Sequence, residues 1–339
     1  MVPVIRSLQQ AWPETQITWI IGRTESVLLG DLDGVEFITF DKRAGAASRR
    51  AVAEALSQRR FDALLLMQVA LRAGWLSRVV RADQRIGFDS QRSRDFHGLF
   101  VNRRIAPHPR AHVMDGFFDF INALGVTERV LRWDIPVPEA ARQRADDLVP
   151  PDQPTMVISP CSSQRVANFR NWSIASYVEL VRHAHNRHGL QVIITGGPTA
   201  EERRYGESIA REAGVPVENL VGRTTLKELL AILGRAEVVV SPDSGPAHMA
   251  VAAGTPVIGL YATSNPDRTG PYLGRRWVVN RYPDAVKAHW GKSVDQVAWG
   301  RRVRRADAMD LITVADVTGR LDALMATPGA ERLQERISP

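Results

Sequence analysis

The sequence predicts an α/β protein with mostly parallel sheets and two domains, and three observations lead to this prediction. Short β-branched or aromatic runs alternate with helical segments along most of the 339 residues, which is typical of parallel sheets. A chain of this length exceeds what one hydrophobic core usually serves. Five prolines fall within residues 134–154, and this composition indicates a linker between two domains.

The first half begins with a predicted helix over residues 1–12, because Val4, Ile5, Leu8 and Trp12 fall on one helical face. A helix with no strand before it is unusual for this fold class. The rest of this half alternates as a parallel α/β unit requires. The expected strands are 16–21, 35–40, 63–67 and 84–88, and the expected helices are 44–58, 70–80 and 111–124.

The second half repeats the rhythm more regularly. Its expected strands are 156–159, 191–195, 219–221, 238–240, 257–261 and 277–280, and its expected helices are 140–148, 173–187, 201–213, 226–233, 247–253 and 315–325. Residues 291–307 are expected to be irregular. We therefore divide the chain into an N-terminal domain (1–135), a linker (136–153), a C-terminal domain (154–310) and a closing helix with a tail (311–339).

The stretch 238–266, VVVSPDSGPAHMAVAAGTPVIGLYATSNP, carries the main functional signal. Asp243 and Ser244 are good N-caps for the helix that follows, and Gly245 lets a ligand approach the backbone. A helix start at the carboxyl end of a parallel strand suits an anion, above all a diphosphate. An ordinary capped turn would explain these residues too. A second polar loop, 263–266, ends the next strand, however, and two adjacent loops of this kind predict a ligand-binding crevice.

Two further loops at strand ends are polar or glycine-rich, 160–172 and 196–202. Ser162 and Ser163 can supply hydroxyls to phosphates, Arg170 a positive charge, and Glu201 or Glu202 a carboxylate to ribose hydroxyls. Each residue alone has an ordinary explanation as a helix cap or a helix-dipole partner, so only their convergence is informative. The sequence has neither G-x-G-x-x-G after these strands nor a Walker A lysine motif, which argues against dehydrogenases and P-loop NTPases.

The net charge and the cysteine content limit the classes of binding partner and of metal site that the protein can have. The net charge of +7 and the isoelectric point near 10 suit an acidic partner such as phosphate, nucleic acid or an anionic membrane face. Motifs that interleave basic residues with stacking aromatics are missing, so we expect no nucleic acid partner. The single cysteine, Cys161, excludes an internal disulfide and makes a cysteine-rich zinc site implausible.

Residues 91–110, QRSRDFHGLFVNRRIAPHPR, combine arginines and two histidines with Phe96, Leu99 and Phe100. One interpretation is a solvated loop with a few apolar anchors. The other is a basic site for an acidic acceptor, because arginine can bind phosphate or carboxylate with two parallel hydrogen bonds. Composition alone favours neither.

The motif PDSGPAHMAVAAGTPVIGLY followed by ATSNPDRTGPY resembles the donor-site segment of the ADP-heptose:lipopolysaccharide heptosyltransferases, glycosyltransferase family 9. The likeness extends to SPCSS and RNW within 159–172, TGGPTAEER at 195–203, and RIGFD with LFVNRRI within 85–105, and so covers nearly the whole chain. The resemblance implies the GT-B architecture, with two Rossmann-like domains facing across a cleft. It also implies an inverting transfer of heptose from ADP-heptose to the Kdo or heptose of a lipid A-core precursor, with no cofactor and no metal.

The resemblance also implies roles for particular residues. Ser244, Gly245 and His248 would contact the donor diphosphate or the heptose, and Asp243 would shape that loop. His248 lies one helical turn beyond Ser244, so its ring could reach the ligand, although a core histidine bonded to a carbonyl is the alternative. In the two neighbouring loops, Ser162, Ser163 and Arg170 would hold phosphate, and Glu201 or Glu202 would bind ribose.

Arg94, Arg104 and His112 would face the acceptor. The enzyme would work in the cytoplasm, in peripheral contact with the inner face of the inner membrane, where its basic excess suits an anionic surface.

One departure from the family pattern concerns the start of the chain. The family begins with a strand and a loop containing Gly-Asp, whose aspartate is the expected general base, and the helix at residues 1–12 would follow that loop. We therefore expect this strand and its aspartate to lie upstream of Met1, in roughly 15 further residues.

Two alternative functions remain open at this point. One is another GT-B enzyme, either a UDP-sugar transferase or an epimerase. The other is a catalytically impaired relative that binds an ADP-sugar without turnover.

Overall fold

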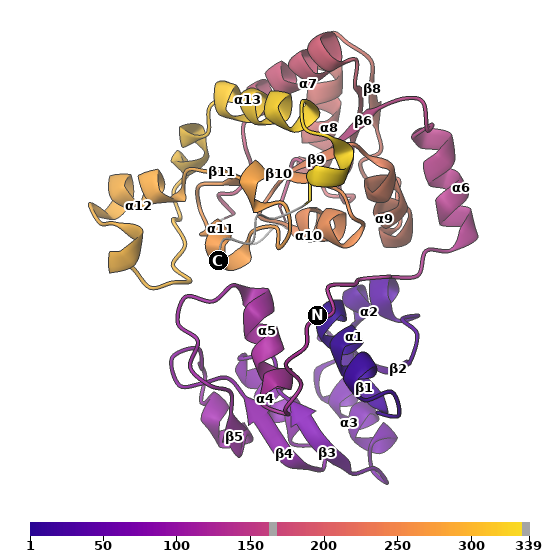
Figure 1. Ribbon diagram of the computed structural model, residues 1–339, viewed down its shortest axis with the longest axis vertical. Helices are drawn as coiled ribbons and strands as arrows, with labels where there is room; N and C mark the ends of the chain where they lie inside the picture. The colour runs from indigo at the N-terminus through magenta and orange to yellow at the C-terminus, as the bar shows by residue number, and fades with distance from the viewer. Residues whose placement is uncertain (163–167, 334–339) are drawn as a thin grey trace. The chain divides into compact units, whose positions relative to one another are not determined.

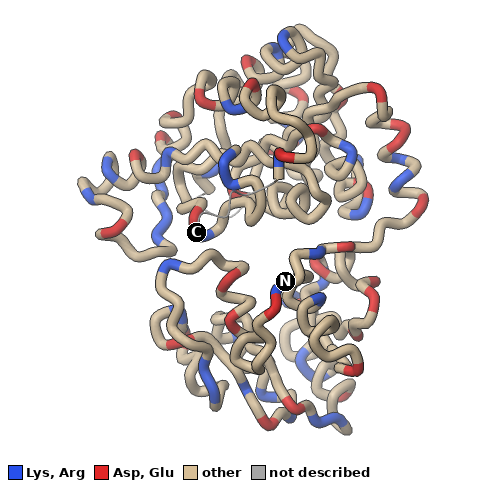
Figure 2. Tube along the Cα trace, in the orientation of Figure 1, with Lys and Arg blue, Asp and Glu red and all other residues tan. Residues whose placement is uncertain are grey.

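The computed structural model describes residues 1–162 and 168–333, and these form two compact units, Met1–Pro136 and Val137–Pro339 (Figure 1). Each unit contains parallel sheet with helices packed against it. Lys and Arg are interspersed with Asp and Glu in each unit (Figure 2). Among the described residues, every helix is too short or too polar to span a bilayer.

The first unit contains each strand and helix that the sequence predicts, and α2, η1 and β5 in addition. Its strands are β1 (Ile17–Gly22), β2 (Val35–Phe40), β3 (Phe61–Leu65), β4 (Ala82–Gly87) and β5 (Arg103–Arg104). Its helices are α1 (Val2–Ala11), α2 (Arg23–Leu29), α3 (Gly45–Ala55), α4 (Leu71–Ser77), α5 (Val113–Asn122) and the 3-10 turn η1 (His97–Phe100).

The strands of the first unit form two separate parallel sheets, one of β1 and β2 and one of β3, β4 and β5. Most positions of β1 and β3 are only partly buried, because each of these strands pairs with one neighbour among the described residues. Helices α1 and α5 supply much of the core here, with Val4, Leu8, Phe118 and Ile121 packed together. Side chains of β1 and β3 pack against this cluster rather than forming it.

The second unit holds one larger parallel sheet. Its strands are β6 (Thr155–Ile158), β7 (Gln191–Ile194), β8 (Val217–Asn219), β9 (Val238–Pro242), β10 (Val257–Tyr261) and β11 (Val279–Asn280). Its α-helices are α6 (Glu139–Leu148), α7 (Ile174–His188), α8 (Ala200–Glu212), α9 (Leu226–Arg235), α10 (Gly245–Ala252), α11 (Pro266–Thr269), α12 (Tyr282–Trp290) and α13 (Val314–Met325). Short 3-10 turns are η2 (Arg275–Trp277), η3 (Val294–Gln296), η4 (Ala308–Leu311) and η5 (Gly329–Glu331).

The strand order of this sheet is β11-β10-β9-β6-β7-β8, and every neighbouring pair is parallel. Strands β6, β9 and β10 are buried at every position, which explains their continuous apolar sequences. One face of the sheet packs against α7, α8 and α13 in the main core cluster (Figure 1). A buried sheet covered by helices can hold the loops at its carboxyl edge in fixed positions.

The structure also contains elements that the sequence did not predict. They are α2, β5, α11 and α12 and the 3-10 turns. Each is short or polar, so its hydrophobic period is weak. The stretch 136–153, expected as a linker, includes α6, and this helix packs against α9 within the second unit.

Candidate functional site

The candidate site lies at the carboxyl ends of β6 and β9. The chain leaves β6 toward β7 and β8 on one side of the sheet, and leaves β9 toward β10 and β11 on the other. Ligands of open α/β sheets bind where the strand order reverses in this way. The loops that the sequence singled out, 160–172 and 243–244, follow these two strands.

A row of buried hydroxyls holds the ends of these strands together. Ser159 and Thr195 share a hydrogen bond of 2.6 Å between their hydroxyls, and the Ser241 hydroxyl donates to the Ser159 carbonyl at 3.2 Å. The hydroxyls of Ser241 and Ser244 are 2.8 Å apart. These bonds fix the carboxyl ends of β6, β7 and β9 relative to one another, and we call this set of hydroxyls the platform. Sequence reasoning missed this platform, because single serines at strand ends carry no pattern.

Helix α10 begins at this platform with its first turn open. Ser244 is the N-cap in an extended conformation, but its side chain accepts no hydrogen bond from the helix, because it pairs with Ser241 instead. Gly245 is exposed, and a Cβ added to it would meet no atom within 4 Å. Pro246 has no N–H, so Gly245 supplies the first backbone donor of the helix. The free space beside Gly245 and the positive end of the helix dipole together favour an anion here.

Two arginines flank the loop that precedes α10. The Arg170 guanidinium donates to the carbonyl of Asp243 at 2.8 Å and lies 3.8 Å from its carboxylate. Arg302 lies 3.7 Å from the same carboxylate oxygen. That oxygen, Oδ2 of Asp243, is buried and has no hydrogen-bond partner among the described residues. Sequence reasoning found Arg170 and Asp243 but missed Arg302, which comes from the irregular segment 291–307.

Three buried polar atoms at this edge of the sheet are unsatisfied. Besides Asp243 Oδ2, they are Ser264 Oγ and Asn265 Nδ2 in the loop after β10, and they make up three of the four such side-chain atoms in the described part of the chain. The same loop borders a small hollow that is also lined by Arg268, Thr269 and residues 299–302. Unsatisfied buried polar atoms are rare in native proteins, so their gathering after β9 and β10 indicates a place for a polar ligand.

An amide network joins the described residues on either side of 163–167 in the segment after β6. Ser162 is buried, its hydroxyl donates to Asn168 Oδ1 at 2.7 Å, and its N–H donates to Asn171 Oδ1 at 2.9 Å. Asn171 in turn donates to Glu201 at 3.3 Å. Ser163, predicted to act beside Ser162, lies outside the described residues. The two asparagines were not predicted, although their i, i+3 spacing beside Arg170 is a signal that could have been used.

The structure separates the two glutamates proposed for ribose. Glu202 accepts hydrogen bonds from the Gly197 N–H at 2.8 Å and the Thr199 hydroxyl at 2.6 Å, and so fixes the turn before α8. Glu201 is exposed and is connected through Asn171 to the loop after β6. Of the two, Glu201 is the more exposed carboxylate.

Two ionisable groups close to this loop are held neutral by burial. Burial, with a smaller contribution from the Glu202 and Glu201 charges, raises the pKa of Cys161 to about 12. Burial likewise raises the pKa of Tyr205 to about 12, and its hydroxyl donates to the Trp172 carbonyl at 3.0 Å. Cys161 therefore stays a thiol near neutral pH and is no nucleophile.

His248 lies on α10, one turn after its start. Its neighbours Ala247, Met249 and Ala250 are buried against the sheet, whereas His248 is exposed. His248 is therefore not part of the core of the sheet. Desolvation by the surrounding atoms, opposed by the Asp243 charge, lowers the pKa of its imidazole.

The residues predicted to face an acceptor separate into two groups in the first unit. Arg94 and Arg104 are exposed and flank η1, where the Arg104 guanidinium lies against Gly98. His112 is buried and caps α5, because its Nδ1 accepts the Met114 N–H at 3.1 Å. His97, in η1, is also buried and accepts the Phe88 N–H at 3.1 Å. Burial, then the Arg104 charge, lowers the pKa of His97.

The parallel sheet, the open helix start at its switch point and the adjacent arginines are typical of nucleotide-binding α/β proteins of the Rossmann type. Comparison with known proteins gives the family. Residues 49–297 match glycosyltransferase family 9 (heptosyltransferase). The chain belongs to this family and is therefore a glycosyltransferase.

Relatives in sequence agree with this assignment. The lipopolysaccharide core heptosyltransferase OpsX of Haemophilus influenzae is 36% identical over 95% of this chain and 91% of its own length. Lipopolysaccharide heptosyltransferase 3 of Escherichia coli K12 is 24% identical over 97% of this chain and 96% of its own length.

Solved structures support the GT-B fold. A family 9 glycosyltransferase from Veillonella parvula has a TM-score of 0.76 at 18% identity, over 96% of this chain and 92% of its own. The E. coli heptosyltransferase WaaC with ADP has a TM-score of 0.73 at 19% identity, over 95% of this chain and 94% of its own. The prediction of two Rossmann-like domains of the GT-B class is confirmed.

Proposed function

We propose that this protein transfers heptose from ADP-heptose to the inner core of a lipopolysaccharide precursor, with a Kdo or heptose residue as acceptor. The observation that carries the proposal is the open start of α10 between Arg170 and Arg302, at the switch point of the sheet. Family membership and the names of the relatives support heptose as the transferred sugar and the lipopolysaccharide core as its destination. No observation favours a UDP-sugar enzyme, an epimerase or an impaired relative.

We place the donor by the chemistry of its parts. The diphosphate would lie at the helix start, where the N–H of Gly245 donates to it and Arg170 balances its charge. The ribose hydroxyls would bind the exposed carboxylate of Glu201. Ser264 Oγ and Asn265 Nδ2, both unsatisfied, would meet polar groups of the sugar or the phosphates. The exposed imidazole of His248 would lie beside the diphosphate.

The reaction is a single displacement with inversion at the anomeric carbon. The acceptor oxygen forms a bond to that carbon while the bond to the diphosphate oxygen breaks, and ADP leaves with the electron pair. The acceptor hydroxyl loses its proton to a base. Charge grows on the leaving diphosphate, and fixed donors aimed at that charge lower the barrier. Arg170 is held in position by the Asp243 carbonyl before the donor binds, so little reorganisation is needed.

The first unit offers a surface suited to the membrane that holds such an acceptor. Leu71 and Trp75 on α4 are 41% and 55% exposed, and Phe96 and Leu99 at η1 are 75% and 72% exposed. Helix α4 packs against η1, with Gly74 and Trp75 against Phe100. These four apolar side chains therefore lie on adjacent elements and form what we call the α4–η1 surface.

The charge and the backbone conformation of the α4–η1 surface also support contact with a membrane. Exposed arginines surround these side chains: Arg72 lies on α4, Arg78 directly follows α4, Arg94 precedes η1, and Arg103 and Arg104 form β5. Phe96 has a φ of +59°, which is uncommon for a bulky residue, and such backbone conformations cluster at binding and catalytic sites. Aromatic and leucine side chains among arginines are typical of surfaces that bind anionic lipid headgroups. We propose that the α4–η1 surface contacts the membrane.

Vesicle sedimentation tests this contact. Phe96→Ser combined with Leu99→Ser should reduce binding to vesicles containing anionic phospholipid at least about tenfold, by loss of buried apolar area. Val27→Ser is a matched control, because Val27 is also exposed, at 57%, but lies on α2. Equal binding of the double variant and the control would contradict the assignment of the α4–η1 surface.

A transfer assay tests the function itself. The protein is incubated with ADP-heptose and lipid A bearing Kdo or a first heptose, and products are analysed by mass spectrometry. A mass gain of one heptose with either acceptor, together with tighter binding of ADP than of UDP in calorimetry, is the expected result. Preference for UDP, or ADP binding without any product, would overturn the proposal in favour of another sugar-nucleotide enzyme or an impaired relative.

A further inference from the structure

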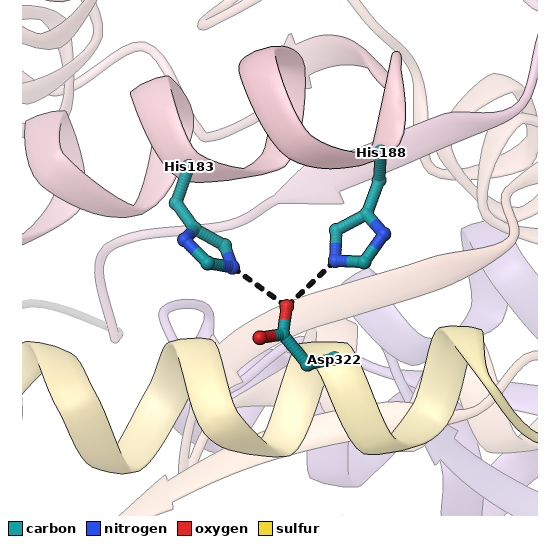
Figure 3. A group of neighbouring side chains, drawn as sticks. All are labelled: His183, His188 and Asp322. Atoms are coloured by element: carbon teal, nitrogen blue, oxygen red, sulfur yellow. Dashed lines mark hydrogen bonds and ion pairs between the residues drawn. The ribbon is translucent and has the colours of Figure 1, made fainter.

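A cluster of three potential metal ligands lies in the second unit, away from the donor site. The Nε2 atoms of His183 and His188 each lie 2.7 Å from Oδ1 of Asp322. The three ligand atoms are all within 4.8 Å of one another. Figure 3 shows both imidazoles, from α7, turned toward the carboxylate, which α13 presents from the facing helix. We propose that His183, His188 and Asp322 bind a divalent transition-metal ion, with Zn²⁺ as the fitting ion.

The ligand chemistry matches zinc. Two imidazole nitrogens and one carboxylate oxygen are a common protein ligand set for Zn²⁺, with bonds of about 2.0–2.2 Å. Tetrahedral coordination with such bonds places ligand atoms about 3.3–3.6 Å apart. Entry of an ion would therefore move Asp322 Oδ1 and the imidazoles apart by less than about 1 Å from their present contacts of 2.7 Å. All three side chains are half-buried, so solvent can occupy the remaining coordination positions.

Neighbouring groups orient the Asp322 carboxylate and favour a cation beside it. Arg187 lies 3.3 Å from Oδ2 of Asp322, which orients the group and leaves Oδ1 toward the imidazoles. The negative end of the α7 dipole, at His188, further favours a cation.

The position in the fold indicates a structural role. Helix α7 ends at His188, just before β7 starts at Gln191, so the cluster lies at the edge where the strands begin. The donor site lies at the opposite edge, where they end. The ion would join α7 to α13 across 134 residues of sequence from His188 to Asp322. Such a cross-link would stabilise the second unit without taking part in transfer.

Metal titration of the whole protein tests the proposal. After removal of metals with a chelator, the protein should bind one Zn²⁺ in equilibrium dialysis and show a higher melting temperature. His183→Gln and His188→Gln should each weaken Zn²⁺ binding at least about tenfold. Glutamine keeps an amide donor toward Asp322, so these variants should still fold, and circular dichroism without metal checks this.

His185→Gln is the matched control. His185 lies on the same turn of α7 and is half-buried, but it is not one of the three converging side chains. Its replacement should leave Zn²⁺ affinity unchanged. Absorption by bound Co²⁺ provides a second readout, since a d–d band that disappears in His188→Gln reports coordination by that imidazole. Equal Zn²⁺ uptake by the wild type and the His183→Gln/His188→Gln double variant, or no saturable uptake at all, would overturn the proposal and leave a metal-free hydrogen-bonded contact.

Discussion

Gly245 gives the sharpest test of how the donor binds. A Cβ at this position meets no protein atom within 4 Å, and its φ is not in the left-handed region. Gly245→Ala should therefore keep or raise the free energy of unfolding, by up to about 1 kcal/mol from helix propensity. The new methyl group would, however, lie where we place the diphosphate, at the first residue of α10.

The expected loss can be worked out from hydrogen bonds to charged groups, which contribute about 1.5–3 kcal/mol each. Displacing the diphosphate from one such bond should weaken ADP binding roughly 10- to 100-fold. At an ADP concentration 100 times the wild-type Kd, ligand stabilisation should fall from about 2.7 kcal/mol to about 0.4–1.4 kcal/mol.

Calorimetric titration with ADP and thermal unfolding with and without ADP measure these quantities. Gly319→Ala in α13 is the matched control, because Gly319 is also exposed and helical, and a Cβ there also meets no atom within 4 Å. It should gain stability without losing ADP affinity. If Gly245→Ala binds ADP within about twofold of the control, the diphosphate does not approach this helix start and the reasoning is refuted.

Three further predictions concern the loops around this site. Glu201→Gln should weaken ADP binding with little effect on stability. Glu202→Gln should instead lower the free energy of unfolding by about 1–2 kcal/mol, because Glu202 holds the turn before α8. Calorimetry measures the ADP affinity and urea unfolding the stability of each variant, and the reverse pattern would contradict the assignment. Arg170→Lys should weaken ADP binding roughly tenfold or more through loss of its bond to the Asp243 carbonyl, and unchanged affinity would count against a phosphate role. Cys161, with its pKa raised to about 12, should resist iodoacetamide at pH 8 until the protein is unfolded. Because the unfolded thiol ionises first, stability should also fall as the pH rises from about 9 toward 12, and rapid labelling of the native protein would contradict the buried placement.

The sequence predicted most of the architecture because buried parallel strands are continuous apolar runs. Val257–Tyr261 appears in the structure with the bounds predicted from its sequence. Helix α12 was missed, since Tyr282, Ala285 and Val286 are buried among polar residues that hide the period. The split of the first unit into two sheets could not be predicted, because strand pairing depends on contacts between distant residues.

The candidate site was predictable where local chemistry signals it. Asp243, Ser244 and the polar loop 263–266 were singled out by their place after apolar strands, although only Ser244 is the N-cap of α10 and its side chain makes no capping bond. Arg302 and the metal-ligand cluster with Asp322 were not predicted, because their partners are far away in sequence. Only the fold brings such residues together, and single arginines and aspartates carry no periodic signal.

A crystal structure of the protein with ADP bound is the most direct test of the central claim. We predict the bridging phosphates at the start of α10, with at least one N–H of its first turn about 2.7–3.2 Å from a phosphate oxygen and Arg170 beside them. ADP bound at another edge of the sheet, or with its phosphates turned away from Ser244 and Gly245, would contradict it.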